Sequence, residues 1–274
     1  MEDLLDSTGP MRLKKCRHGH MLYSINDATI GQLFDLYGEF SEGEVELLGQ
    51  LMKPGDTVIE VGANIGSLTV PLAQFVGPQG TVVAFEPHRI LFQNLCANIA
   101  INGHTNVKTQ NSAVGKENRS VVLPYIDYSK PGIFGGHSIE GAAGGESVGL
   151  IALDKYLNTS KCRLMKIDVE GMEEDVILGA AALINRLHPF LYVENDQEEK
   201  SGSLISTLQG LGYTLYWHLR PLCRTDNYFG HEKKFLANII SINMLCAPPG
   251  ATVAGMDKMR ISSPQDWWKK YATH

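Results

Sequence analysis

Short apolar runs alternate with amphipathic stretches along most of the chain. The first run, residues 57–61, follows the turn residues Pro54-Gly55-Asp56 and is rich in β-branched side chains, which is typical of a buried strand. Strands and helices that alternate in sequence indicate βαβ units and a mostly parallel sheet. The pattern predicts further strands at 81–85, 107–109, 163–168 and 189–194, and helices at 67–75, 89–101, 173–187 and 204–211.

Two regions, one in the middle of the chain and one near its end, depart from this alternation. Residues 120–125 are apolar and predict an inserted strand, whereas residues 131–149 are rich in glycine and predict a loop. Late in the chain, two strand-like runs at 213–218 and 238–244 have no helical pattern between them. We therefore expect these two runs to form an antiparallel pair at the edge of the sheet.

The first fifty residues lie outside the alternating core. Residues 21–24 and 29–30 flank the turn residues Asn26-Asp27 and predict a hairpin. Ser41, with Glu44 three residues later, predicts the capped start of a helix. The expected organisation is an N-terminal hairpin and helix extension (1–52), a core (53–247) with a glycine-rich insertion around 126–150, and a C-terminal tail (248–274).

Composition limits the possible classes of protein. Hydrophobic residues make up 43% and charged residues 20% of 274 residues, which excludes a globally disordered chain. The formal net charge of -6, from 24 Lys and Arg against 30 Asp and Glu, disfavours a nucleic acid partner because the surface does not attract phosphates. Five scattered cysteines and acidic opening residues favour a cytoplasmic protein. The longest uncharged stretch contains Pro248-Pro249-Gly250, so no membrane segment is expected.

The segment Glu60-Val61-Gly62-Ala63-Asn64-Ile65-Gly66 leads from the first core strand through a glycine-rich turn into a helix. A dinucleotide fingerprint requires glycine at its first, third and sixth positions, where this chain has Gly62, Asn64 and Ser67. Glu60 would repel a pyrophosphate but attract a cationic amino acid. The turn therefore favours S-adenosylmethionine over NAD. The expected contact residues are Glu60, Gly62, Asn64 and Gly66.

Two further positions fit an adenosine. Glu86 ends the next strand roughly twenty residues after the turn, where a carboxylate can accept hydrogen bonds from both ribose hydroxyls. Ser112 and Ala113 follow the third strand, where a turn can meet the edge of an adenine. NAD proteins share the acidic residue, and a non-catalytic adenosine-binding module would share all of these features. Polar residues at two later strand ends disfavour such a module.

These motifs resemble the FkbM-type family of class I S-adenosylmethionine-dependent methyltransferases. The resemblance rests on residues 58–66, on Phe85-Glu86-Pro87, on the run Lys-Ile-Asp-Val-Glu-Gly-Met-Glu at 166–173 and on the lead-in residues 37–44. It implies an α/β, Rossmann-like fold, with a mostly parallel seven-stranded sheet, helices on both faces and an antiparallel last strand. It also implies that Tyr37 and Glu42 close over the cofactor, and that the activity is O-methylation of a sugar or polyketide hydroxyl.

Methyl transfer to a hydroxyl requires close alignment and a group that takes the hydroxyl proton. Asp168 and Glu194 end neighbouring strands at the edge of the sheet that faces the cofactor, where Asp168 can also hold the methionine ammonium or cap the following helix. His218 ends a late strand, and His231 lies in a polar and aromatic loop that is able to cover the acceptor. His137, in the glycine-rich loop, is a further candidate base.

A lysine and a metal are alternatives at the same edge. Lys166 lies within a strand on the same face as Asp168, and a buried ammonium requires a partner, so we expect it to pair with a carboxylate rather than act as a base. Asp168 with Glu194-Asn195 is similar in residue type and spacing to the magnesium ligands of catechol O-methyltransferases. A divalent metal is therefore an alternative to hydrogen bonding of the substrate alone.

The sequence as a whole predicts an enzyme that transfers a methyl group from S-adenosylmethionine to a hydroxyl of a sugar or natural-product acceptor. The expected partner is a small molecule or glycan, with no nucleic acid and no membrane, and the oligomeric state is left open. One alternative keeps the fold and methylates an amide or amine nitrogen of a peptide or protein. The other is an NAD-dependent oxidoreductase, against which Glu60 and the incomplete glycine pattern argue.

Overall fold

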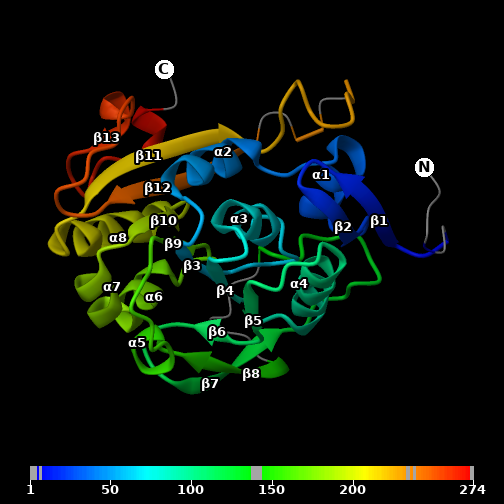
Figure 1. Ribbon diagram of the computed structural model, residues 1–274, viewed down its shortest axis with the longest axis horizontal. Helices are drawn as coiled ribbons and strands as arrows, with labels where there is room; N and C mark the ends of the chain where they lie inside the picture. The colour runs from blue at the N-terminus through cyan, green and yellow to red at the C-terminus, as the bar shows by residue number, and fades with distance from the viewer. Residues whose placement is uncertain (1–4, 6–7, 137–143, 233–234, 237–238, 272–274) are drawn as a thin grey trace.

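The computed structural model describes residues 5, 8–136, 144–232, 235–236 and 239–271. Its centre is an eight-stranded sheet in the order β13-β11-β12-β10-β9-β3-β4-β5 (Figure 1). The five strands from β10 to β5 are parallel to one another, whereas β12 is antiparallel to both of its neighbours. The strands are β3 (Thr57–Val61), β4 (Thr81–Phe85), β5 (Val107–Gln110), β9 (Leu164–Ile167), β10 (Phe190–Glu194), β11 (Thr214–Pro221), β12 (Ile240–Ala247) and β13 (Arg260–Ile261).

This arrangement confirms the predicted Rossmann-like α/β class, with seven core strands and an antiparallel last one. The two-residue strand β13 extends the sheet by pairing with β11, so the predicted antiparallel pair of β11 and β12 is covered at its outer edge. Asn238, the predicted start of β12, lies outside the described residues. None of the helices in the described part of the chain is long and apolar enough to cross a membrane.

Helices cover both faces of the sheet, which explains why its strands are almost continuously apolar. One face of the strands, including Val58 and Val82, packs with Leu72 of α3 and Leu95 of α4. The opposite face packs with α6, α7 and α8 and with the C-terminal tail, whose Trp267 ring meets Trp217 edge-on at 5.9 Å. The helices are α1 (Ile30–Tyr37), α2 (Glu42–Leu51), α3 (Thr69–Val76), α4 (Arg89–Ile101), α5 (Leu153–Tyr156), α6 (Glu173–Gly179), α7 (Ala181–Leu187), α8 (Glu198–Gly210), and the 3-10 turns η1 (Asp257–Met259) and η2 (Trp268–Lys270).

The predicted N-terminal hairpin is displaced. The structure forms it from β1 (Met11–Cys16) and β2 (Gly19–Ser24), whereas residues 29–30 lead into α1. Asp27 pairs instead with Gly132 of the insertion in an isolated parallel bridge. Ser41 precedes α2 as predicted, and its hydroxyl donates to Glu44 at 2.6 Å, so the two side chains bond to each other rather than to the backbone.

The end of the insertion, in β8 (Gly145–Ile151), forms a small sheet with β6 (Ala113–Val114) and β7 (Arg119–Pro124), below the main sheet in Figure 1. The predicted loop over 131–149 is therefore too long, because its last residues pair with β7. Gly145 is required there, since a Cβ atom would lie 1.5 Å from the Leu123 carbonyl oxygen. Residues 137–143 lie outside the described part of the chain.

Three predicted helices have different limits. The helix expected over 67–75 begins later, at Thr69, and ends at Val76. The single helix expected over 173–187 is divided into α6 and α7 at Ala180. The division follows Gly179, which contacts the backbone of Gly115 so closely that a Cβ atom would lie 2.0 Å from its carbonyl oxygen. The helix predicted at 204–211 begins earlier, at Glu198.

Candidate functional site

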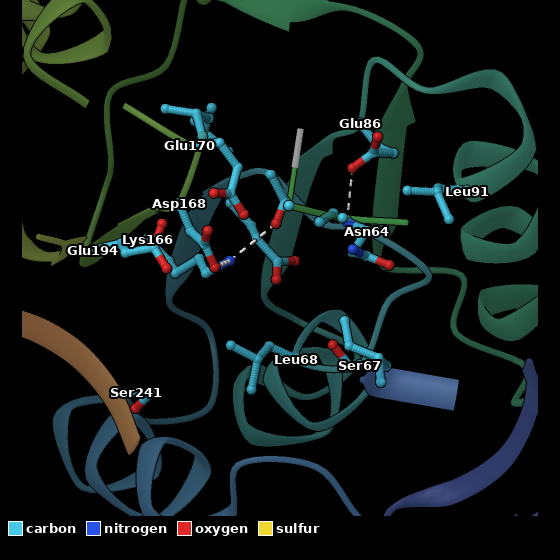
Figure 2. A pocket seen from close by; sticks show the side chains of 18 of the residues that line it. Asn64, Ser67, Leu68, Glu86, Leu91, Lys166, Asp168, Glu170, Glu194 and Ser241 are labelled. Atoms are coloured by element: carbon cyan, nitrogen blue, oxygen red, sulfur yellow. Dashed lines mark hydrogen bonds and ion pairs between the residues drawn. The ribbon is translucent and has the colours of Figure 1, made fainter. Parts of the chain in front are cut away.

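A cavity of about 300 Å³ opens at the carboxyl ends of β3, β4, β9 and β10. The chain passes outward from β3 to β4 and β5 and returns to β9 on the other side of β3, so the cavity lies where the strand order reverses. Open α/β sheets bind their ligands at such a point. Figure 2 shows acidic side chains on one side of the cavity, and Glu86 and Leu91 on the other.

The turn after β3 forms the floor of the cavity and depends on glycine. Gly62 has φ +82°, and its N–H donates to the Phe85 carbonyl at 3.0 Å. A Cβ atom on Gly62 would lie 1.8 Å from the backbone oxygen of Asp168. The glycine therefore allows the loops after β3 and β9 to approach each other at the site.

Glu86 holds this turn at the end of β4. Its carboxylate accepts the backbone N–H groups of Asn64 (Figure 2) and of His88, both at 2.8 Å. The side chain is buried, and desolvation outweighs these hydrogen bonds and raises its pKa to about 7. Each carboxylate oxygen has a second lone pair, so Glu86 can still accept hydrogen bonds from a ligand. Ser112 and Ala113 line the same cavity.

Glu60 is completely buried at 0% exposure, one residue before the end of β3. The Thr69 hydroxyl donates to its Oε2 at 2.6 Å, whereas its Oε1 has no hydrogen-bond partner. Burial raises the pKa of Glu60 to about 7, and the nearby Lys166 ammonium limits the rise. A buried acceptor without a partner requires a donor or cation from a ligand or solvent.

Lys166 forms the predicted pair with a carboxylate. Its Nζ lies 3.0 Å from Asp168 Oδ2 and donates to the Gly62 carbonyl oxygen at 2.9 Å (Figure 2). Burial favours the neutral amine, but the carboxylates of Asp168 and Glu60 outweigh it and raise the pKa of Lys166. The ammonium therefore stays charged, and the structure does not support Lys166 as a base.

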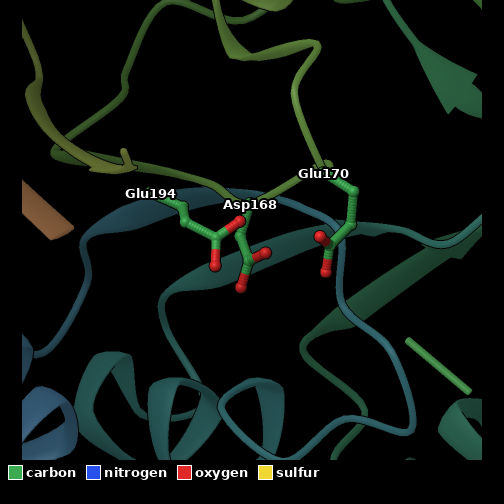
Figure 3. A group of neighbouring side chains, drawn as sticks. All are labelled: Asp168, Glu170 and Glu194. Carbon is green, nitrogen blue, oxygen red and sulfur yellow. The ribbon is translucent and has the colours of Figure 1, made fainter. Parts of the chain in front are cut away.

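Asp168 is also one of three carboxylates that lie close together. Asp168, Glu170 and Glu194 each present an oxygen within 4.8 Å of the others (Figure 3). Desolvation and the neighbouring negative charges raise the pKa of Glu170 to about 8 and that of Glu194 well above its usual value. Sequence reasoning missed Glu170, although it lies in the Asp-Val-Glu-Gly run, because its direction depends on a backbone φ of +56°.

The structure brings most of the predicted cofactor residues together. The predicted cofactor residues that line the cavity are Glu60, Gly62, Asn64, Glu86, Ser112, Ala113 and Asp168, and the predicted catalytic residue Glu194 lines it as well. Gly66 does not line it and instead lies at φ +87° in the turn, where a Cβ atom would come within 2.9 Å of a Leu95 methyl group. Its contribution is to the packing of the turn against α4.

The two candidate bases that the structure describes, His218 and His231, do not line the cavity. His218 lies within β11, which continues to Pro221, and its Nδ1 is 2.8 Å from the Tyr192 hydroxyl. Desolvation lowers its pKa to about 4, so it is neutral at physiological pH. His231 packs against the Tyr37 ring at 5.9 Å and also lies outside the lining. His137 falls among the residues that the structure does not describe.

Three other predicted contacts are engaged elsewhere. The Tyr37 hydroxyl donates to the Phe235 carbonyl at 3.0 Å, and Glu42 pairs with His18 at 2.9 Å, so neither side chain lines the cavity. Asn195 donates to Ser201 at 2.9 Å and turns away from the carboxylates. The predicted group of metal ligands, Asp168 with Glu194-Asn195, is therefore not formed. The third side chain of the cluster is Glu170 instead of Asn195.

Comparison with known proteins identifies the domain that carries this cavity. A family model described as "Methyltransferase FkbM domain" matches residues 60–215, more than half of the chain. The chain is 27% identical over 208 residues to the 31-O-demethyl-FK506 methyltransferase FkbM of Streptomyces tacrolimicus, covering 64% of this chain and 78% of that protein. It is 41% identical over 66 residues to the catalytic subunit of a tRNA (adenine(58)-N(1))-methyltransferase of Cryptococcus neoformans, covering 24% of this chain.

The chain spans only 15% of the length of that tRNA methyltransferase subunit. Among solved structures, a methyltransferase FkbM from Methylobacillus flagellatus is similar, with 15% identity, a TM-score of 0.47, and coverage of 74% of this chain and 50% of that one. The match to the family model includes the glycine turn, Glu86 and the Asp168 run. The chain belongs to the FkbM methyltransferase family.

Proposed function

We propose that this chain transfers a methyl group from S-adenosylmethionine to a hydroxyl of a sugar or natural-product acceptor. The observation that carries the proposal is the pair of buried carboxylates, Glu60 and Glu86, on either side of the glycine turn at the switch point of the sheet. Family membership supports the reaction class. The O-methyltransferase name of the Streptomyces relative supports a hydroxyl acceptor.

The charges in the cavity fit this donor. Among the described lining residues, Lys166 and His88 are the only basic ones. Glu60 Oε1, which has no partner, suits the ammonium of the methionine part. A pyrophosphate would meet this negative surface and be repelled, which argues against NAD. The acidic lining residues are Asp27, Glu44, Glu60, Glu86, Asp168, Glu170, Glu194 and Asp196.

When bound, the donor supplies an electrophilic methyl group on a sulfonium. In this proposal Glu86 accepts the ribose hydroxyls and Glu60 binds the ammonium, which fixes the donor by charged hydrogen bonds at both ends. Asp168 and Glu194 lie at the open strand ends and accept the hydroxyl of the acceptor. As the new C–O bond forms and the C–S bond breaks, the sulfur keeps the electron pair and one of these carboxylates receives the proton.

Nitrogen methylation is the second candidate, because the fungal tRNA relative is an N-methyltransferase by name. The acidic cavity and the net charge of -6 favour a small acceptor over RNA. An amine acceptor of a peptide or protein is compatible with the same carboxylates. The predicted absence of a nucleic acid partner therefore stays a prediction.

Calorimetry and a product screen test the proposal. S-adenosylhomocysteine is expected to bind the purified protein with one site per chain, and NAD is expected to show no binding. Incubation with isotopically labelled S-adenosylmethionine and a metabolite extract should then label an alcohol, identified by mass spectrometry. Binding of NAD without S-adenosylhomocysteine would contradict the donor assignment, and labelling of amines alone would replace the acceptor class.

Donor binding is also expected to depend on pH. The pKa values of Glu60 and Glu86 are both raised to about 7, so both carboxyls become neutral as the pH falls below that value. The affinity for S-adenosylhomocysteine should therefore fall by up to about tenfold per pH unit for each group between pH 7 and 5.5. Isothermal titration across this range measures the change.

The stability of the ligand-free protein should change in the opposite direction. Folding raises both pKa values above the ordinary 4.5, so these groups lower the free energy of unfolding as the pH rises from 4.5 to 7.

A Glu60→Gln variant should bind S-adenosylhomocysteine more weakly at pH 7.5. Its affinity should also depend less steeply on pH, with Glu86, Lys166 and Asp168 still present. An affinity that is constant from pH 8 to 5.5 in the unmodified protein would contradict the assignment.

A further inference from the structure

The three carboxylates beside Lys166 come from two neighbouring strand ends. Asp168 and Glu170 follow β9, and Glu194 is the last residue of β10. Figure 3 shows their carboxylates on the same side of the chain, directed toward a common space. One oxygen from each lies within 4.8 Å of the other two. Like charges held at this distance repel each other unless a cation or proton lies between them.

A second observation indicates that a ligand is required here. Glu194 Oε2 is shielded from solvent and has no hydrogen-bond partner. The Lys166 ammonium donates to Asp168 Oδ2 and to the Gly62 carbonyl, and Glu194 Oε2 is without a donor beside it. Buried acceptors without partners are rare and indicate an ion, water or ligand.

We propose that Asp168, Glu170 and Glu194 bind a hard divalent cation. When all three carboxyls are ionised, their charge exceeds that of the single Lys166 ammonium by two negative charges, the complement of a divalent ion that takes the place of their protons. Carboxylate oxygens are the ligands that Ca²⁺, Mg²⁺ and Mn²⁺ prefer, and the remaining positions on the ion are taken by water or substrate.

The spacing of the oxygens suits such an ion. Opposite ligands lie about 4.6–5.2 Å apart around Ca²⁺ and about 4.0–4.2 Å apart around Mg²⁺. The three oxygens lie within 4.8 Å of one another, inside the largest spacing that Ca²⁺ allows, and binding of the smaller Mg²⁺ would bring the carboxylates closer together. Asp196 lines the cavity nearby and adds negative charge without belonging to the set.

The role of the ion, unlike its binding, rests on the proposed function. At this edge it would coordinate the acceptor oxygen and lower the pKa of its hydroxyl, which favours transfer of the proton to solvent or a carboxylate. Glu170, to which the proposed donor contacts give no role, would then hold the ion.

Metal binding can be measured without donor or acceptor. In a titration of the purified full chain with Mn²⁺, followed by electron paramagnetic resonance of the free ion, we expect saturable binding of one ion per chain. Ca²⁺ and Mg²⁺ should displace it. E170Q and E194Q should each weaken Mn²⁺ binding at least about tenfold. The matched control is D196N, which removes one nearby charge but no ligand and should weaken binding by less than about threefold.

The outcomes are distinct. The proposal would be overturned if Mn²⁺ at millimolar concentration showed no saturable binding. It would also be overturned if D196N and E170Q lost Mn²⁺ affinity equally, because the ion would then respond only to the negative charge of the region. Circular dichroism and thermal unfolding check each variant, and E170Q decides alone should E194Q fail to fold, because Glu170 lies in a loop. Failure of the proposed function would appear separately, as absence of S-adenosylhomocysteine binding in the unmodified protein.

Discussion

A Glu86→Ala variant is expected to lose at least about a hundredfold in affinity for S-adenosylhomocysteine, since hydrogen bonds to a charged group contribute about 1.5–3 kcal/mol each and two ribose hydroxyls are involved. The same carboxylate accepts the N–H groups of Asn64 and His88, which shape the turn beneath the ligand. Its removal therefore affects both the direct contact and the shape of the site. Isothermal titration calorimetry at pH 7.5 measures the loss.

The control for this variant is Glu146→Ala. Glu146 is a half-exposed glutamate on β8 that pairs with Arg89 and lies outside the cavity lining, so its replacement removes the same charge. Its affinity for S-adenosylhomocysteine should stay within about twofold of the unmodified protein, as expected for a surface ion pair. Glu86→Gln separates the two effects, because it preserves one acceptor for the turn. Equal affinities of Glu86→Ala and Glu146→Ala would show that Glu86 does not bind the donor.

Replacing Gly62 with alanine is expected to lower the free energy of unfolding by more than about 3 kcal/mol and to abolish binding of the donor. The new methyl group has no space, and Gly62 has a left-handed backbone conformation. Its Cβ would lie 1.8 Å from the Asp168 carbonyl oxygen, so the loops after β3 and β9 must separate. Separation moves Asp168, Lys166 and the floor of the cavity together. Chemical denaturation and calorimetry measure the two losses.

Gly55 provides the matched control for Gly62. It has a similar φ of +90°, but a Cβ atom there would meet nothing within 4 Å. Gly55→Ala should therefore cost only the backbone strain of about 1–2 kcal/mol and leave donor binding intact. Equal losses of stability in both variants would show that the contact with Asp168 is not what requires glycine at position 62.

The main sheet could be predicted because its signals are local. Residues 57–61 and 81–85 are apolar runs bounded by turn residues, and both form strands with these limits. The N-terminal hairpin was misplaced for the same reason. Asn26-Asp27 has the composition of a turn, whereas the actual two-residue turn, Arg17-His18, has no turn signal and is fixed by the pairing of β1 with β2.

The residues that we propose to bind the donor follow from sequence, and those that we propose to meet the acceptor do not. Glu60, Gly62 and Glu86 lie at positions fixed by strand ends, so their convergence follows from the parallel sheet. His218 was expected at the end of a strand, but three more residues continue β11 and its ring turns to Tyr192. Glu170 enters the cavity through a left-handed backbone that glutamate rarely adopts, which no pattern of residue types reveals.

The bridge between Asp27 and Gly132 joins two segments that are about a hundred residues apart in the sequence. Ala28 N–H and the Gly132 carbonyl bond at 2.8 Å, and Gly132 N–H returns a bond to Asn26 at 2.9 Å. Thr29 and Ile30 on one side and Ile133, Gly135 and Gly136 on the other all border the cavity. The mouth of the site is thus a single frame built from both segments. Truncation of either segment would remove the backbone hydrogen bonds that hold the other segment. A redesign of this side of the cavity therefore has to treat the two segments as one unit.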